Sequence, residues 1–290
     1  MLSAKKYKGN PIIVPSLEKK ESSIYNPTTV VRKEKVFLLG RSEFGHENKT
    51  ISKINLFSSQ NGFSFKPFPK NPVIKPEKKY EKMGCEDPRV IKTDKNNYFL
   101  TYTAYKGKDK NGDYKIKLMG ALSKDLISWQ KFPLIDNEKS GAVVQNYKHK
   151  DQYVMYFGGK EIKIAFSRDL KKWKFDAKPI FTARKGNFFD NYLVEPGPPP
   201  ILIKKGILLI YNGKNAAGKF SAGWAIFDKN NPAKLLKRSR KPILEPIEYW
   251  EKYGKVNNVI FATGLVFFKG KWLLYYGGAD KSTGVAVLNF

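Results

Sequence analysis

The chain has 290 residues, a formal net charge of +28, 41% hydrophobic residues and 14% aromatic residues. This hydrophobic content excludes a disordered chain, and the length is sufficient for a large core. The excess of 54 Lys and Arg over 26 Asp and Glu is also found in nucleic-acid-binding proteins. Most of these cations are Lys spread evenly along the chain, so we interpret them as a solvated surface and expect no nucleic-acid partner.

Few residues are available for redox or metal chemistry. Cys85 is the single cysteine, which excludes an internal disulfide, and His46 and His149 are too few for a His-based metal site or a convincing triad. We therefore expect no metal. The N-terminus lacks an apolar leader, and the longest apolar run, Val259–Phe268, is shorter than a membrane span. These features predict a cytoplasmic protein with no membrane partner, and they leave its oligomeric state open.

Five short apolar runs recur about fifty to sixty-five residues apart along the chain. Near-continuous apolar character is typical of strands that are buried on both faces. With the many aromatic, Gly and Pro residues, the regular spacing predicts an all-β fold, a five-bladed β-propeller in which residues 1–290 form a single domain. A β-sandwich is the alternative, and regular spacing makes it less attractive. The runs are Val36–Leu39, Tyr98–Tyr102, Tyr153–Phe157, Ile207–Tyr211 and Trp272–Tyr276.

A second repeat consists of turn sequences. Ser123–Trp129 and Ser167–Trp173 share the pattern Ser-x-Asp-Leu-x-x-Trp, and Leu56–Phe65 contains a degenerate third copy. Ser and Asp favour turns, and a Trp at the end can cover the apolar face of a hairpin.

The stretch Gly84–Arg89 places Glu86, Asp87 and Arg89 around a proline, directly before a strand-like run. Because proline cannot continue a central strand, we expect a turn at a strand end. Two carboxylates beside an Arg suit acid–base chemistry on a neutral, hydroxyl-rich substrate, since Arg keeps one acid ionised while burial raises the pKa of another. The alternative is a surface turn with an ion pair.

Loops of the other predicted blades offer further polar residues. Arg41 follows the first apolar run, where it can bind two sugar hydroxyls or pair with Asp87. Glu195 precedes Pro196-Gly-Pro-Pro-Pro200, and a loop made rigid by prolines can preorganise a base. The alternative for Glu195 is a solvated loop acid.

Six kinds of motif occur in order from about Asn26 to Val287: Gly-x-Glu-Asp-Pro-Arg, Tyr-Thr-Ala-Tyr, the two Ser-x-Asp-Leu-x-x-Trp turns, Gly-Pro-Pro-Pro-Ile, Asn-Val-Ile-Phe-x-x-Gly and Tyr-Tyr-Gly-Gly-Ala-Asp. Together these motifs resemble glycoside hydrolase family 130. The resemblance implies a five-bladed propeller that acts on β-mannosides with inversion, as a phosphorylase or as a hydrolase.

The resemblance also implies roles for individual residues. Asp87 matches the catalytic acid of the family, whose proton is thought to pass through a hydroxyl of the bound mannose to the glycosidic oxygen. Arg41 and Asp280 match sugar-binding residues. The full set that we expect to bind substrate comprises Asn26, Arg41, Glu86, Arg89, Tyr102, Lys139, Asn212, Glu251, Asn258 and Asp280.

The sequence departs from the family pattern where phosphorylases bind phosphate. An Arg-Asn pair is replaced by Lys139-Ser140, a basic residue by Leu193, and the His of Tyr-His-Gly by Asn212. Glu195 would repel phosphate at close range unless it is screened by Lys139, and it can instead polarise a water. We therefore expect an inverting hydrolase, with Asp87 as acid and Glu195 as base, that needs no cofactor.

The expected substrates are mannose-containing oligosaccharides. Among these we expect β-1,2-linked manno-oligosaccharides, cleaved from the non-reducing end. The linkage comes from the resemblance alone. The first alternative is a β-mannoside phosphorylase that uses inorganic phosphate as co-substrate and releases mannose 1-phosphate. The others are a non-catalytic carbohydrate-binding propeller and a related glycosidase for arabinosides, xylosides or fructosides. That last class usually carries an Asp base in the first blade, where this chain has Asn26.

Overall fold

The computed structural model describes residues 2–16, 18, 20–45 and 50–290, so His46 lies outside the described residues. Within this part of the chain the regular secondary structure is almost entirely strand, which confirms the predicted all-β class. The helical segments described are the single 3-10 turn η1 (Lys79–Glu81) and the short helix α1 (Tyr249–Lys252). Neither helix is long and apolar enough to cross a membrane.

The strands form four hydrogen-bonded sheets, which divide into five groups. The largest sheet runs in the order β2-β3-β4-β6-β7-β8-β9, and its two halves are joined at one parallel residue pair, Ser52 with Gly84. We treat these halves as separate strand groups. The first comprises β2 (Glu21–Arg32), β3 (Lys35–Phe44), β4 (Ile51–Ser59) and β5 (Lys66–Pro67), and the second comprises β6 (Gly84–Lys92), β7 (Tyr98–Lys108), β8 (Tyr114–Ser123) and β9 (Gln130–Asp136).

Each of the other three sheets is one strand group. The third comprises β10 (Ala142–Val143), β11 (Tyr153–Phe157), β12 (Lys163–Ser167) and β13 (Lys174–Phe175). The fourth comprises β14 (Leu193–Pro196), β15 (Ile201–Ile203), β16 (Gly206–Lys214), β17 (Phe220–Phe227) and β18 (Leu235–Arg238). The fifth comprises β19 (Ile260–Phe268), β20 (Lys271–Gly278), β21 (Ser282–Asn289) and β1 (Ser3–Lys6).

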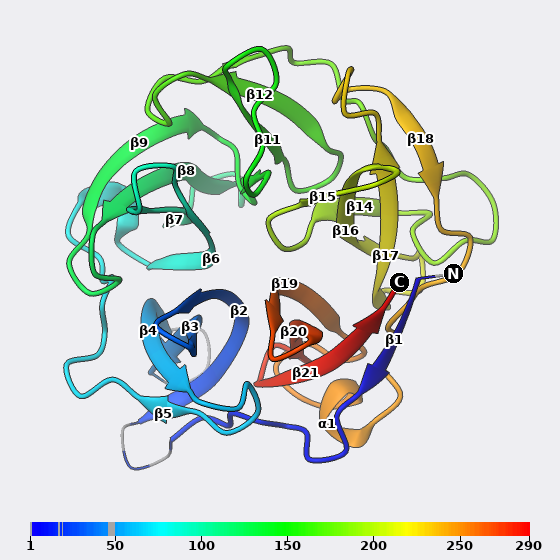
Figure 1. Ribbon diagram of the computed structural model, residues 1–290. Coiled ribbons are helices and arrows are strands. Elements are labelled where there is room, and N and C mark those ends of the chain that lie inside the picture. The colour runs from blue at the N-terminus through cyan, green and yellow to red at the C-terminus, as the bar shows by residue number, and fades with distance from the viewer. Residues whose placement is uncertain (1, 17, 19, 46–49) are drawn as a thin grey trace.

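The groups follow one another in chain order around a common centre (Figure 1). Contacts run from β2 to β6, from β6 to β10, from β11 to β14, from β16 to β19, and from β19 back to β2. The N-terminal strand β1 pairs with β21, Ser3 opposite Asn289, so the two ends of the chain share one group. The innermost strands β2, β6, β10, β14 and β19 therefore face a shared central region, where a site can draw residues from every group.

The five predicted apolar runs lie in β3, β7, β11, β16 and β20, the second strand of each group. Leu38, Leu100, Tyr156, Leu209 and Leu274 from these strands are fully buried. Because both faces of a second strand pack against neighbouring groups, apolar residues occupy consecutive positions instead of alternating with polar ones. The core thus lies between the groups, and the sequence repeat reflects it.

The Ser-x-Asp-Leu-x-x-Trp turns have the same hydrogen bonds in both copies. Ser123 and Ser167 accept the backbone N–H of the Leu three residues later, at 2.9 Å in each copy. Each Trp indole donates to the carbonyl of that Leu at 3.0 Å. In the degenerate copy, Ser59 accepts the N–H of Gly62 at 2.9 Å, so the same turn forms without the Trp.

Three strand groups contain a buried carboxylate that joins their second and outermost strands. In the second group, Glu81 accepts from the Tyr102 hydroxyl of β7 at 2.6 Å and from Lys131 Nζ of β9 at 2.9 Å. In the fourth group, Asp190 accepts hydrogen bonds from the Tyr211 hydroxyl and from Arg238. In the fifth group, Glu251 accepts a hydrogen bond from the Tyr276 hydroxyl and forms an ion pair with Lys6. These carboxylates are fully buried, so their hydrogen bonds offset a large desolvation cost.

Removing the phenol hydroxyl should weaken such a carboxylate site. We expect Tyr102→Phe to lower the free energy of unfolding by about 1–3 kcal/mol, because Glu81 loses a donor it cannot replace with water. Tyr192→Phe is the control, since Tyr192 is 63% exposed and its hydroxyl can bind solvent. Urea unfolding of the three proteins measures the difference, and equal stabilities of the two variants would contradict the proposed role of Glu81.

Candidate active site

Two inner strands contain the same irregularity, an Asx-Pro pair inserted into an antiparallel ladder. In β2, Tyr25 pairs with Arg41 and Thr28 with Leu39, so Asn26 and Pro27 lie opposite one residue of β3. In β6, Glu86 pairs with Thr103 and Arg89 with Thr101, so Asp87 and Pro88 lie opposite one residue of β7. Asn26 and Asp87 have φ of 47° and 51°, a left-handed conformation that Asn and Asp tolerate better than most residues.

The prediction that Pro88 ends a strand is therefore wrong. Pro88 lies inside β6, where a bulge on the innermost strand of the group allows a residue without an N–H. Glu195, expected in a loop, also lies in a strand, β14, where it pairs with Asn212 of β16. Bulges next to functional sites redirect side chains. Asp87 lies in such a bulge and Glu195 in a paired strand, so both predicted carboxylates are positioned by hydrogen-bonded strands.

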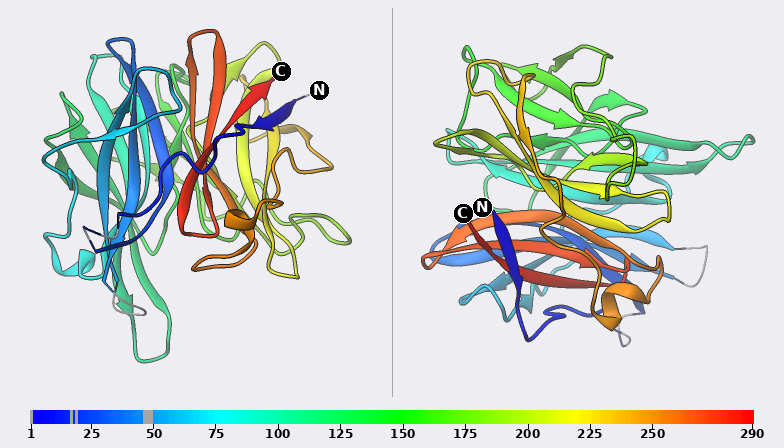
Figure 2. Two further views of the ribbon diagram at one scale, coloured as in Figure 1. Left: turned by 90° about the horizontal axis from the view of Figure 1, so that it is seen from below. Right: turned by 90° about the vertical axis from the view of Figure 1, so that its right-hand side faces the viewer.

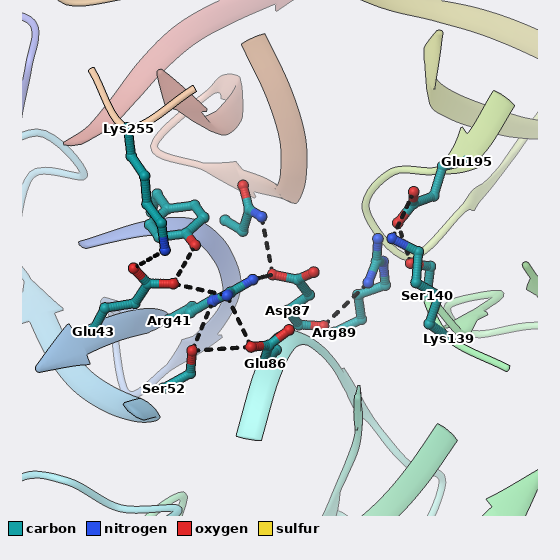
Figure 3. A network of polar contacts seen from close by, with 12 residues as sticks. Arg41, Glu43, Ser52, Glu86, Asp87, Arg89, Lys139, Ser140, Glu195 and Lys255 are labelled. Carbon is teal, nitrogen blue, oxygen red and sulfur yellow. Dashed lines mark hydrogen bonds and ion pairs between the residues drawn. The ribbon is translucent and has the colours of Figure 1, made fainter. Parts of the chain in front are cut away.

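Asp87 and Glu195 line one cavity of about 1230 Å³. Both carboxylates are buried, with relative exposures of 7% for Asp87 and 2% for Glu195. The cavity therefore meets the first requirement of the predicted chemistry, two carboxyl groups from different strand groups on one space (Figure 3). The other predicted site residues that line it are Asn26, Arg41, Glu86, Lys139 and Asp280.

Arg41 is the centre of the polar network on one side of this cavity (Figure 3). Its Nη2 lies 2.8 Å from Glu43 Oε1 and 2.8 Å from Glu86 Oε1, and its Nη1 lies 3.3 Å from Asp87 Oδ1. Its Nε donates to Ser52 at 3.1 Å. Of the two predicted uses of Arg41, the structure shows the pairing with Asp87, and it adds two further carboxylates.

Asp87 receives a second donor from the neighbouring strand. Asn26 Nδ2 donates to Asp87 Oδ1 at 2.9 Å, so the two equivalent bulges meet through their side chains. Burial raises the pKa of Asp87, but Arg41, Lys139 and the Asn26 hydrogen bond outweigh burial and hold the pKa below its usual value. The structure thus favours the ionised form of Asp87 in the absence of a substrate.

The pKa values of two neighbouring carboxyl groups shift in the opposite direction. Burial raises the pKa of Asp280 to about 7, with Arg41 opposing burial and the negative charges of Asp87 and Glu43 reinforcing it. Burial also raises the pKa of Glu86, against the attraction of Arg41. The predicted contrast in pKa between neighbouring acids is therefore present, with the pKa of Asp87 lowered and those of Glu86 and Asp280 raised.

Glu195 has a different environment on the far side of Arg89 (Figure 3). Lys139 Nζ lies 3.0 Å from Glu195 Oε2, and the Ser140 hydroxyl donates to Glu195 Oε1. Lys139 therefore already forms an ion pair with a carboxylate of the protein. A free anion that approached Lys139 would meet the negative charge of Glu195 at the same place.

Arg89 connects the two carboxylate strands without lining the cavity. Its guanidinium donates to the backbone carbonyls of Asp87 at 3.1 Å, Pro196 at 2.7 Å and Gly197 at 2.8 Å. Arg89 is fully buried and therefore holds β6 and β14 together instead of contacting substrate. The prediction that Arg89 binds substrate is not supported by this position.

Four other predicted substrate-binding residues also lie away from the cavity lining. Tyr102 and Glu251 belong to the buried carboxylate sites described above, where each needs the hydrogen bonds of its own strand group. The Asn212 side chain exchanges hydrogen bonds with the backbone of Ala262, at 2.7 and 3.0 Å, which ties β16 to β19. Asn258 is exposed, and its carbonyl accepts from Phe220. The structure places these four residues outside the cavity lining, so their contact with substrate stays a prediction.

Sequence reasoning missed Glu43, Lys255 and Tyr25. Tyr25 donates to Glu43 at 2.7 Å, and Lys255 pairs with the same carboxylate from the fifth group. Glu43 follows Arg41 by two positions in β3, and the period of a strand places such residues on one face. That signal was available for Glu43, whereas the approach of Lys255 depends on the ring arrangement.

The family model for glycoside hydrolase 130, described as beta-1,4-mannooligosaccharide phosphorylase, matches residues 4–290. The chain belongs to this family. A 1,2-beta-oligomannan phosphorylase of Thermoanaerobacter sp. (strain X514) is 34% identical and covers 99% of this chain and 98% of the relative. A beta-1,2-mannobiose phosphorylase of the same organism is 31% identical, covering 87% of this chain and 82% of the relative.

A solved structure of the family has the same fold, with a TM-score of 0.90 and 30% identity over 99% of this chain and 94% of that chain. It is described with the statement that the GH130 family of mannoside phosphorylases contains glycoside hydrolases that target beta-1,2 mannosidic linkages in Candida mannan. That description names both phosphorylases and hydrolases within the family.

The raised pKa of Asp280 predicts a pH-dependent stability difference. A carboxyl with a raised pKa in the folded state contributes stability below its ordinary value near 3.8, and this contribution is lost as the pH rises through about 7. The Asn side chain of the Asp280→Asn variant does not titrate. As the pH rises from 4 to 8, the free energy of unfolding of this variant should therefore increase relative to that of the wild type. Urea unfolding across this range measures the gain, and a difference that is constant with pH would contradict it.

Proposed function

We propose that this chain is a five-bladed β-propeller, in one domain, that cleaves β-mannosides. The five strand groups and the contacts that connect the last group to the first support the propeller. Membership of the family and the mannoside relatives support a carbohydrate-active enzyme with a mannose-containing oligosaccharide as substrate. A β-1,2 linkage is supported by the names of both Thermoanaerobacter relatives.

In the proposed reaction Asp87 is the acid that assists departure of the glycosidic oxygen. A carboxyl with a lowered pKa is a poor donor, so substrate binding has to raise the pKa of Asp87. Displacement of water by the sugar would do this, because desolvation favours the neutral form. The resemblance of Asp87 to the family acid adds a route for the proton through a mannose hydroxyl.

The position of Glu195 is the observation that carries hydrolysis as the second half of the proposal. Glu195 is a buried carboxylate on the cavity wall, on a different strand group from Asp87. An inverting hydrolase needs a base across the sugar from the acid, with space for a water between them. Ser140 and Lys139 hold the Glu195 carboxylate in place through a hydrogen bond and an ion pair.

Phosphorolysis is the second candidate, and the names of the curated relatives support it better than hydrolysis. Inorganic phosphate would then replace water as the attacking group, and the product would be mannose 1-phosphate. For this, Lys139 would have to exchange its partner Glu195 for phosphate. We place hydrolysis first because of Glu195 in this chain, and because the family includes a structure described with hydrolases. A cofactor-free reaction and a cytoplasmic location stay predictions.

One experiment separates the two acceptors. The protein is incubated with β-1,2-mannobiose with and without inorganic phosphate, and the products are followed by NMR. We expect mannose at equal rates in both reactions, first as the α-anomer, because attack by water inverts the configuration. Phosphate-dependent formation of mannose 1-phosphate would instead establish the phosphorylase.

Amide variants test the two carboxylates. We expect Asp87→Asn and Glu195→Gln each to lower kcat by about a hundredfold to ten-thousandfold, the usual contribution of a positioned acid or base. Lys117→Gln, which replaces a cation paired with Asp136 outside the cavity lining, is the control and should be fully active. Calorimetric binding of mannobiose by inactive variants would distinguish lost chemistry from lost folding.

If the wild type binds mannobiose but does not cleave it under either condition, the carbohydrate-binding alternative replaces the enzyme. Cleavage of a nitrophenyl arabinoside together with failure on mannosides would favour the related glycosidase class instead.

A further inference from the structure

The hairpin of β7 and β8 extends beyond the ring. Both panels of Figure 2 show its cyan-green tip projecting past the neighbouring elements, on the side away from the two chain termini. The tip is held by Asp109, whose side chain accepts the N–H groups of Asn111 at 2.9 Å and Asp113 at 3.0 Å. Asp109 also pairs with Lys115 at 2.8 Å. The projecting segment is therefore an ordered structure with its own hydrogen bonds.

One face of the hairpin forms part of the cavity that contains Asp87 and Glu195. Tyr105, Lys108, Tyr114 and Ile116 all line that cavity. The Tyr105 and Tyr114 rings are 5.7 Å apart at 37°, and Lys108 Nζ lies 4.7 Å from the centroid of the Tyr114 ring. These contacts hold the Tyr114 ring at the cavity although 62% of the residue is exposed.

The cavity is larger than a single sugar bound beside the carboxylates would require. Its volume of about 1230 Å³ exceeds the range of about 300–1,000 Å³ that is usual for small-molecule sites. Its floor is polar where the inner strands meet, whereas the hairpin supplies an aromatic wall. Sugars have apolar C–H faces, which aromatic rings cover favourably, and polar edges, which remain in water.

We propose that Tyr114 forms a subsite for a sugar ring of an oligosaccharide, beyond the two rings that flank the cleaved bond. This inference rests on the proposed function and deepens it: the substrates are manno-oligosaccharides longer than a disaccharide. Tyr105 and Lys108 position the Tyr114 ring, and the neighbouring Asp109 keeps the hairpin tip in place.

The test compares substrates of two lengths. We expect Tyr114→Ala to lower kcat/KM for β-1,2-mannotetraose about threefold to tenfold, the amount expected for one lost stacking contact, and to leave β-1,2-mannobiose unchanged. Tyr114→Phe should behave like the wild type, because stacking needs the ring and not the hydroxyl. Tyr192→Ala is the matched control: Tyr192 is 63% exposed and has Lys214 Nζ at 5.3 Å, but it lies outside the cavity lining.

Each outcome has a definite meaning. An equal loss for both substrates, no loss for either, or the same loss in Tyr192→Ala would overturn the subsite while the proposed function stands. If the wild type cleaves neither substrate, the proposed function fails, and calorimetric titration with mannotetraose decides the subsite. Weaker binding by Tyr114→Ala than by the wild type and Tyr114→Phe would then support it, and equal binding or no binding would overturn it.

Discussion

The arrangement of the site depends on one guanidinium surrounded by carboxylates. Glu43, Glu86 and Asp87 converge on Arg41, and without it these three acids, of which Glu43 and Asp87 are buried and Glu86 is partly buried, would lose their common cation. Arg41 extends from β3 and reaches Asp87 on β6, so the same interaction that makes the charge cluster tolerable also joins the first two strand groups. Arg41 affects the pKa values of the neighbouring acids to different extents. At Asp87 the attraction of Arg41 contributes to a lowered pKa, whereas at Asp280 and Glu86 burial outweighs Arg41 and the pKa values are raised.

Backbone irregularity gives this cluster its position. The paired bulges at Asn26 and Asp87 place an amide and a carboxylate on adjacent inner strands, close enough to hydrogen bond. Arg89 then fastens the Asp87 strand to the Glu195 strand through backbone carbonyls. A buried Arg bound to carbonyls has no freedom to follow a substrate, so it defines the separation of the two carboxylates and leaves recognition to the side chains on the cavity wall.

The choice between water and phosphate depends on the environment of Lys139. Where Lys139 pairs with Glu195, the cavity wall already presents a carboxylate and a second anion is disfavoured. Relatives named as phosphorylases share about a third of their residues with this chain, which establishes the family and leaves the attacking group to experiment. Within one fold, the identity of a few wall residues can change the acceptor.

The sequence alone determined the strand class, the five apolar runs, the repeated turns and the residue types at the site, because periodicity and turn chemistry are local properties. Asp87, Glu195 and Arg41 were predicted from the residue types around them and from the family resemblance, and the structure places all three on one cavity. Only the tertiary structure decided which polar residues share a space: Tyr102 and Glu251 have site-like neighbours in sequence but stabilise the interiors of their own strand groups. Lys255 approaches Glu43 from the opposite end of the chain, because the ring brings the fifth strand group beside the first, and no spacing in the sequence encodes that contact.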